Sequence, residues 1–308
     1  MSSYKPEGLL LETAENKQHM RSAAALQEAC LTNKTLEARA VVCDSEHNLV
    51  VDLGIMRGVI PREEGALGII DGTAKDIAII SRVNKAVCFK VLSLDADSSG
   101  KPLAILSRRL AQEECRQSYL AKLRNGDVIP ARVTHLEPFG AFVDIGCGIP
   151  SLIPIDSISV SRIMHPKDRF RCGQDIYAVV RSIDEAGRIC LSHKELLGTW
   201  AQNSIFFAPG QTVAGIIRSV EEYGVFVELA PNLAGLAELK EDVAAGQHAS
   251  VYIKSLIPEK MKVKLIIVDS FEVSNYTPTF SYFITEGHID RFQYSPDCCS
   301  KVVETVFE

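Results

Sequence analysis

The sequence lacks any long uncharged apolar run. No stretch approaches the roughly 18 apolar residues that a membrane-spanning helix needs. Residues 9–11 are all leucine, but Glu12 follows at once, so this run is too short for the core of a signal peptide. We therefore expect a cytoplasmic protein that has no membrane partner.

Catalytic and metal-binding motifs are also missing. The sequence has no HExxH, P-loop or GxSxG motif, and its nine cysteines show no CxxC spacing. Scattered cysteines without a disulfide framework are typical of a reducing compartment. We therefore predict that the protein is not an enzyme and that it has no catalytic residue, no cofactor and no metal site.

The chain has no excess of positive charge. Its 33 Lys and Arg residues against 39 Asp and Glu give a formal net charge of −6. This charge argues against a protein that holds nucleic acid by bulk electrostatics, so any such binding must depend on a local surface. At 308 residues, the chain is long enough for about two to three domains.

One pattern occurs three times along the chain. The first half of the pattern occupies residues 125–133 and 139–144 and is repeated position for position in 209–217 and 223–228. A later strand at 173–182 is repeated at matching spacing in 246–255. A weaker copy occupies residues 36–61 and 84–108, and its end at 105–108 parallels 190–193. Internal repeats of this kind indicate a tandem array of one structural unit.

Each copy consists of short runs rich in Val, Ile and Phe, separated by Gly, Pro, Asn and Asp, which predicts about five strands per copy. A five-stranded unit of this size hides its edges by closing into a barrel. We therefore expect a mainly β protein with three tandem five-stranded OB-fold barrels, helical connectors, an N-terminal helix and a C-terminal hairpin whose strands are 279–285 and 289–294. The predicted segments are a helical segment at 1–30, a divergent barrel at 31–107, a helical linker at 108–124, a barrel at 125–196, a linker at 197–208, a barrel at 209–270 and the hairpin appendix at 271–308.

The middle copy resembles the S-one RNA-binding domain, the OB-type barrel repeated in the large RNA-binding protein of the bacterial small ribosomal subunit. Residues 139–144, 158–166 and 183–192 carry the resemblance, which extends more weakly over residues 31–270. It implies an S-one-type barrel and binding of single-stranded RNA.

In this family, the binding face combines two aromatic rings, a third-strand histidine, and an Asp and an Arg near the fourth loop. Carried over to this sequence, the resemblance implies RNA-binding roles for Phe139, Phe142, Asp184 and Arg188 in the middle copy and for Tyr223, Phe226 and Lys262 in the third. Pro154 replaces the histidine, Pro258 stands near the Asp position, and the first copy has His47 and Val50 at the aromatic positions. RNA contact by the first barrel is therefore in doubt.

The residue types fit this chemistry, because exposed aromatic rings stack on unpaired bases. A Phe in a strand can also be a core residue, so exposure decides between the two roles. Further basic candidates for phosphate contact are Arg162, His165, Lys167, Arg169, Arg218 and Lys254. The stretch from Arg162 to Arg171 could equally be a solvated loop neutralised by nearby carboxylates. His135, His193 and His248 are expected at the surface or at a barrel rim.

The sequence thus favours a single-stranded RNA-binding protein similar to a short ribosomal S-one protein, which binds mRNA on the small ribosomal subunit in translation. The alternative is a protein-interaction scaffold of OB barrels in a ribosome, RNA-decay or transcription complex. That alternative predicts buried Phe139 and Tyr223, or a binding face blocked by acidic neighbours. A third possibility, an accessory module of an enzyme, is disfavoured by the missing catalytic domain.

Overall fold

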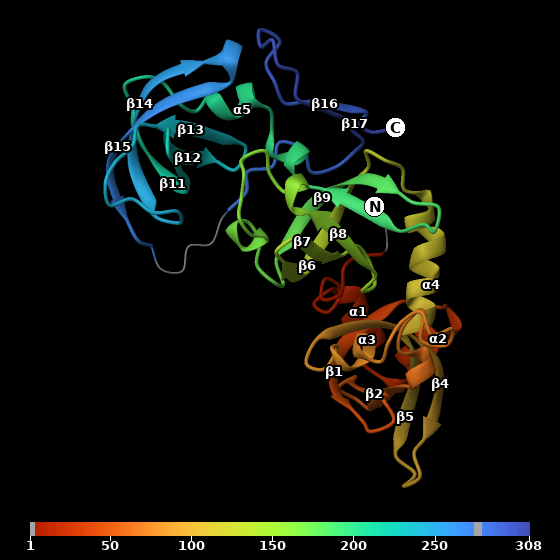
Figure 1. The fold of residues 1–308 in the computed structure, drawn as a ribbon. Helices are drawn as coiled ribbons and strands as arrows, with labels where there is room; N and C mark the ends of the chain where they lie inside the picture. Colours follow the sequence, from red (N-terminus) through yellow and green to blue (C-terminus); the bar gives the residue numbers. More distant parts are fainter. Residues whose placement is uncertain (1–3, 274–278) are drawn as a thin grey trace. The chain divides into compact units, whose positions relative to one another are not determined.

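Three closed five-stranded barrels follow one another along the chain in the computed structural model, which describes residues 4–273 and 279–308 (Figure 1). The order of strands within the sheet is the same in all three barrels: first, second, third, fifth and fourth. The prediction of a mainly β protein with three barrels is confirmed. Residues 1–3 of the predicted N-terminal segment and 274–278 of the predicted appendix lie outside the described residues.

The chain divides into two compact units. The first comprises the residues up to Leu123 together with Asp144–Pro150, and the second comprises Arg124–Val143 and Ser151–Glu308. The second and third barrels therefore share one unit. The seven residues 144–150 connect two strands of the second barrel but belong to the first unit, which is thus built from two separate stretches of sequence.

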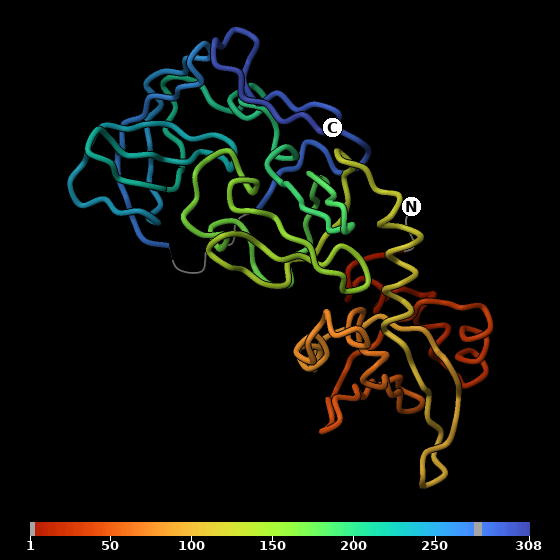
Figure 2. Tube along the Cα trace, turned by 45° about the vertical axis from the view of Figure 1, so that its right-hand side comes forward, coloured from red at the N-terminus to blue at the C-terminus, as the bar shows by residue number. Residues whose placement is uncertain are grey.

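The first barrel contains β1 (Leu36–Cys43), β2 (Leu49–Asp52), β3 (Arg57–Ile60), β4 (Ala86–Ala96) and β5 (Pro102–Ser107). In both views the β4–β5 hairpin extends beyond the rest of this barrel (Figure 2). The helices of this unit are α1 (Ala14–His19), α2 (Ala23–Leu31), α3 (Ile77–Ile80) and α4 (Arg108–Ser118), with short 3-10 turns at Arg62–Glu64 and Leu120–Lys122. Both α2 and α4 pack against β4.

The N-terminal segment differs from the expected single helix, because it forms the two short helices α1 and α2. Ser22 separates them: its backbone is extended and its hydroxyl accepts a hydrogen bond from the Ala25 amide at 3.1 Å. A serine in this position caps a new helix and satisfies one of its free N–H groups. The composition of the segment indicated helix, but this cap divides it.

The second barrel contains β6 (Val128–Glu137), β7 (Gly140–Asp144), β8 (Pro150–Pro154), β9 (Asp175–Ile183) and β10 (Ile189–Ser192). Along β6 the alternate residues Ile129, Ala131 and Val133 are buried, as a strand with one face toward the core requires. The connector that was expected to be helical after β10 consists of a 3-10 turn at Lys194–Leu197 and the single-turn helix α5 (Trp200–Ser204). Further 3-10 turns lie at Ile155–Ser157 and Pro166–Asp168.

The third barrel contains β11 (Thr212–Glu221), β12 (Gly224–Ala230), β13 (Leu233–Ala237), β14 (His248–Ile257) and β15 (Lys262–Phe271), with a 3-10 turn at Pro258–Lys260. Its core extends to the outer side of the second barrel, because Val179 on the outward face of β9 and Trp200 of α5 belong to the same buried cluster as Val227 and Val251. The core also includes the C-terminal residues Phe292, Tyr294 and Phe307.

The C-terminal hairpin exists, but its strands differ from the expected ones. It pairs β16 (Arg291–Gln293) with β17 (Glu304–Val306), so only the strand predicted at 289–294 takes part. Residues 279–285 are described and form no strand. Their aromatic side chains instead pack on the second barrel. The ring centroids of Phe280 and His193 lie 4.9 Å apart, and the Tyr282 hydroxyl forms a hydrogen bond with the His193 Nε2 at 3.0 Å.

A buried ion network joins the second barrel to the third within the second unit. Arg169, with 1% of its side chain exposed, donates from Nη2 to Glu228 Oε2 at 2.5 Å. Glu228 also accepts from Arg218 Nε at 2.8 Å and Nη2 at 3.1 Å. Asn232 adds neutral links, because its Oδ1 accepts from the Val160 amide at 3.0 Å and its Nδ2 donates to the Lys194 carbonyl at 2.7 Å.

We predict that Glu228→Gln lowers the free energy of unfolding by about 3 to 5 kcal/mol, because it leaves the Arg169 guanidinium buried without a carboxylate. Urea unfolding followed by circular dichroism measures this loss. Asp156→Asn is the matched control, since Asp156 pairs with Arg181 at 3.6 Å while 67% of its side chain is exposed. An exposed pair should cost less than about 1 kcal/mol; equal losses for the two variants would contradict the assignment.

His193 is completely buried instead of lying at the surface. Its Nδ1 lies 3.0 Å from the Ile158 carbonyl and its Nε2 accepts from Tyr282, so the ring is held in its neutral form. Burial lowers the pKa of His193 to about 4, and the charge of Arg169 acts in the same direction. A histidine with a lowered pKa in the folded state stabilises the fold above the unfolded pKa near 6.5, and this contribution is lost as the pH falls toward 4.

We therefore expect His193→Asn to make the stability of the protein less dependent on pH. Between pH 7 and pH 4.5, the wild type should lose about 2 to 3 kcal/mol more of its unfolding free energy than the variant does. Urea unfolding at both pH values measures the difference, and His135→Asn, at an exposed position, should behave as the wild type. A slope that is the same in all three proteins would show that His193 titrates normally.

Candidate nucleic-acid interface

Two aromatic pairs occupy matching places on the second and third barrels. In the second barrel the Phe139 and Phe142 ring centroids lie 6.0 Å apart with their planes at 89°, and in the third the Tyr223 and Phe226 centroids lie 6.1 Å apart at 88°. The first ring of each pair is exposed, to 56% for Phe139 and 69% for Tyr223, whereas the second is half-buried. The second and third barrels thus each present one exposed ring that contacts the edge or face of a half-buried ring.

A glycine between the two rings sets this geometry. Gly140 begins β7, and a Cβ atom added to it would lie 2.5 Å from the Ile153 carbonyl oxygen. Gly224 begins β12, and a Cβ atom added to it would lie 2.6 Å from the Ala237 carbonyl oxygen. Gly224 also has φ +150°, which side chains rarely adopt. The close approach of the neighbouring strand therefore requires glycine at both positions.

The third barrel carries a groove of about 600 Å³ beside its aromatic pair. It is lined by rings, aliphatic side chains and lysines, among them Tyr223, Phe226, Leu236, Lys254, Lys262 and Lys264. Lys262 and Lys264 are exposed and alternate along β15 with the buried Val263 and Leu265. The groove therefore combines a stacking surface with positive charge.

Leu236 and Lys264 were not among the predicted site residues. The sequence does contain a signal for Lys264, because the alternation of Lys262, Val263, Lys264 and Leu265 places both lysines on one face of a strand. Leu236 lies on β13, where its neighbours across the sheet are Phe226 and Lys264. Only the pairing of strands brings it to the groove.

The basic stretch of the second barrel is divided between surface and interior. Arg162 and Lys167 are exposed, whereas the Nδ1 of His165 accepts a hydrogen bond from the Lys167 amide at 3.0 Å and caps a 3-10 turn. Arg169 is buried, and Arg218 of the third barrel has 11% of its side chain exposed. Both guanidinium groups bind the buried carboxylate of Glu228, which engages the charge that a phosphate would need.

Asp184 and Arg188 lie together at the turn between β9 and β10. Asp184 Oδ1 accepts from the Arg188 amide at 2.8 Å, and its Oδ2 accepts from Arg188 Nε at 2.7 Å. These hydrogen bonds lower the pKa of Asp184. The Arg188 side chain is 82% exposed, so it can reach a ligand while the carboxylate holds the turn.

The first barrel has no equivalent aromatic pair at its His47 and Val50 positions. Val50 is buried, with 6% of its surface exposed, and the backbone of His47 is in a left-handed turn at φ +65°. The stacking surface of the other two barrels is therefore not reproduced there.

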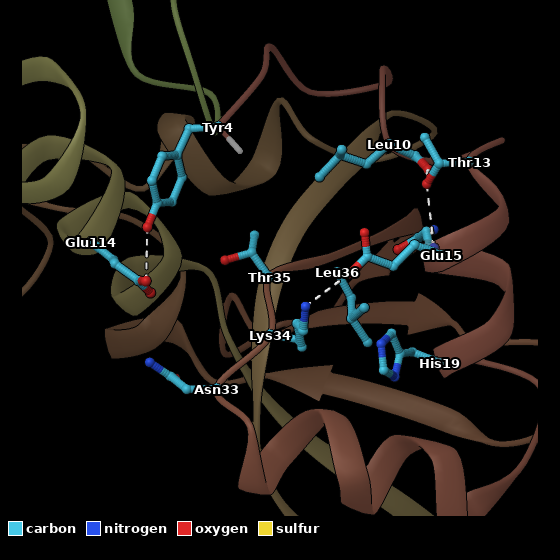
Figure 3. A pocket seen from close by; sticks show the side chains of 11 residues that line it. Tyr4, Leu10, Thr13, Glu15, His19, Asn33, Lys34, Thr35, Leu36 and Glu114 are labelled. Carbon is cyan, nitrogen blue, oxygen red and sulfur yellow. Dashed lines mark hydrogen bonds and ion pairs between the residues drawn. The ribbon is translucent and has the colours of Figure 1, made fainter. Parts of the chain in front are cut away.

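A smaller hollow of about 210 Å³ lies in the first unit, between Tyr4, the first helix and the start of the first barrel (Figure 3). Its charged groups are paired: the Tyr4 hydroxyl donates to Glu114 at 2.7 Å, and Lys34 Nζ bonds Glu15 at 2.9 Å. None of the predicted RNA-binding residues lines it. It offers a polar surface without a free positive charge for a phosphate.

The described part of the chain lacks two further features. No helix there is long and apolar enough to cross a membrane. No group of three or more His, Cys, Asp or Glu side chains among residues 4–273 and 279–308 is arranged to hold a metal ion.

Comparison with known families identifies the second barrel. The family model for the S1 RNA binding domain matches residues 122–194. The Small ribosomal subunit protein bS1 of Staphylococcus aureus (strain COL) is 30% identical over 256 residues, which cover 81% of this chain and 62% of that protein. The bS1 homolog of Bacillus subtilis (strain 168) is 34% identical over 199 residues, covering 63% of this chain and 49% of the relative. The resemblance predicted from the sequence is thereby confirmed.

The chain spans about 62% of the length of the Staphylococcus aureus relatives that it matches. Among solved structures, a multidomain protein with nucleic acid binding domains from Streptococcus pneumoniae is 16% identical, with 79% of this chain and 76% of the other covered, at a TM-score of 0.26. A score this low does not establish a shared arrangement of the whole chain.

Proposed function

We propose that this chain, which contains an S1 RNA-binding domain and is related to bacterial ribosomal protein bS1, binds single-stranded RNA on its second and third barrels. Phe139 with Phe142 and Tyr223 with Phe226 stack on unpaired bases, and the lysines of the third-barrel groove contact phosphates. The S1 match covers the second barrel and the bS1 similarity covers 81% of the chain, so both support this proposal.

The observation that carries the proposal is the repeated aromatic geometry. The second and third barrels have the same edge-on ring pair, and the first ring of the pair is exposed in both. A core role would not require that ring to be open to solvent. Stacking on such a ring contributes about 1 to 3 kcal/mol per base without selecting a sequence.

Beyond RNA binding in general, the cellular role that we propose is that of a bS1-like protein, which binds mRNA on the small ribosomal subunit in the cytoplasm. The names of the relatives support this role. Sedimentation of a lysate with and without RNase treatment tests it: the protein should travel with the small subunit, and RNase should weaken but not abolish this association if the ribosome itself is a partner.

A scaffold that binds only proteins is the second candidate. It requires the aromatic rings to be buried or the binding face to be blocked by carboxylates. Phe139 and Tyr223 are exposed, and lysines outnumber the one carboxylate, Glu238, that lines the groove. These observations favour RNA over a purely protein ligand.

We expect Phe139→Ala combined with Tyr223→Ala, in the full chain, to weaken binding of an unstructured oligoribonucleotide by about 2 to 4 kcal/mol, the loss of roughly two stacked bases. Fluorescence anisotropy measures the affinity. Because both rings are exposed, the thermal midpoint should stay close to that of the wild type. Ile205→Ala, at a position with 79% exposure outside the barrels, is the control. An unchanged affinity in the folded double variant would refute the stacking role.

Salt dependence separates stacking from charge. Arg169 and Arg218 are engaged with Glu228, and the exposed candidates Arg188 and Lys254 already have carboxylate partners at 2.7 and 3.7 Å. We therefore expect about two to four neutralised phosphates, which gives a slope of log affinity against log salt of about −1.4 to −2.8. A titration over increasing potassium chloride measures this slope, and a value near −5 would mean that electrostatics dominate.

A further inference from the structure

One equivalent position on the outward face of the fourth strand is covered in two of the barrels and open in the third. Equivalent positions are identified by strand pairing, because Lys90 lies opposite Ser107, Val179 opposite Ser192, and Tyr252 opposite Ile266. Lys90 is 3% exposed and Val179 is completely buried, whereas Tyr252 is 38% exposed.

In the first barrel, helices cover this face. Both α2 and α4 pack against β4. Lys90 Nζ donates to the Asn33 carbonyl at 2.6 Å, just after α2, and forms an ion pair with Glu114 of α4. The face therefore belongs to the interior of the first unit.

In the second barrel, the C-terminal segment covers the same face. The Val128 amide donates to the Gly287 carbonyl at 3.0 Å, and the Ile289 amide donates to the Gly126 carbonyl at 2.9 Å. Val128 is the partner of Val179 across the strands. Val179 thus lies in the same buried cluster as Ile289.

In the third barrel, the described residues leave this face open. Tyr252 and its partner Ile266 are 38% and 40% exposed, and Val268 further along β15 is 55% exposed. Thr212, opposite Tyr252 on β11, is also exposed. At the position equivalent to Lys90 and Val179, this barrel therefore presents an exposed tyrosine. The outward tyrosine of the second barrel, Tyr177, is 36% exposed and packs against Tyr282 of the C-terminal segment.

This open face is continuous with the RNA groove. Lys254, which lines the groove, lies two residues after Tyr252 on the outward side of β14. Lys264, also in the groove, lies two residues before Ile266 on the outward side of β15. An aromatic ring beside two lysines suits an anionic strand with unpaired bases better than an apolar helix.

We propose that single-stranded RNA leaving the third-barrel groove continues across β14 and β15, where Tyr252 stacks on a further base and Lys254 and Lys264 hold the backbone. This inference rests on the proposed function, because it extends the same RNA site. It gives the third barrel a longer binding path than the second, whose equivalent face is occupied by the chain's own C-terminal segment.

The test is the dependence of affinity on RNA length, measured by fluorescence anisotropy with labelled oligouridylates of 4 and 12 nucleotides and the full chain. Tyr252→Ala should weaken binding of the 12-mer at least about 5-fold, the smallest effect expected for one stacked base, and leave the 4-mer unchanged. Tyr252→Phe should bind both lengths as the wild type does. Phe206→Ala, at an exposed aromatic outside the strands, is the matched control.

The outcomes separate this inference from the proposed function. If Tyr223→Ala weakens both lengths while Tyr252→Ala changes neither, RNA binds the groove only, and the open face is left for a protein. A loss with Tyr252→Ala at both lengths would overturn the extended path by placing Tyr252 in the groove. Failure of the wild type to bind either length would overturn the proposed function and this inference together. Ultraviolet crosslinking of the 12-mer should also map to the peptide that contains Tyr252.

Discussion

The buried carboxylate of Glu228 is the contact on which the second unit depends. It accepts hydrogen bonds from Arg169 of the second barrel and from Arg218 of its own barrel. Removing charges from water is costly, so such a site persists only when each group finds its partner. The partners come from different repeats, so the buried charge of Arg169 in the second barrel is met by a carboxylate of the third. The two aromatic pairs are therefore presented by one body instead of by two independent modules.

The sequence was sufficient to predict the three barrels and the two ring pairs, because these depend on patterns repeated within each copy. Alternating apolar residues fix the strands, and the glycine after Phe139 and Tyr223 marks the close approach of a neighbouring strand. The burial of Arg169 and Arg218 against Glu228 could not be predicted in this way. Each looks like a surface cation within its own repeat, and only the packing of one repeat against another brings them to the same glutamate.

Other differences have local causes that composition does not reveal. The segment before the first barrel is rich in helix-forming residues, yet the hydroxyl of Ser22 starts a second helix and divides it. The first strand of the predicted C-terminal hairpin has the right residue types, but packing of Phe280 and Tyr282 around the buried His193 takes precedence over strand pairing. Long-range contacts of this kind override local preference because they bury more aromatic surface.

The first unit is built from two stretches of sequence, so a single cut in the backbone does not separate it from the rest of the chain. Residues 144–150 contribute contacts that the rest of the unit needs: Asp144 accepts from the Glu7 amide at 2.7 Å, and the Cys147 carbonyl accepts from Gln112 at 3.0 Å. A protease that cut the chain after Leu123 would therefore not release two self-sufficient pieces, since the shorter fragment would lack these seven residues. The sequence repeats are thus not independent folding units. After such a cut, the two fragments should remain associated until the protein is denatured.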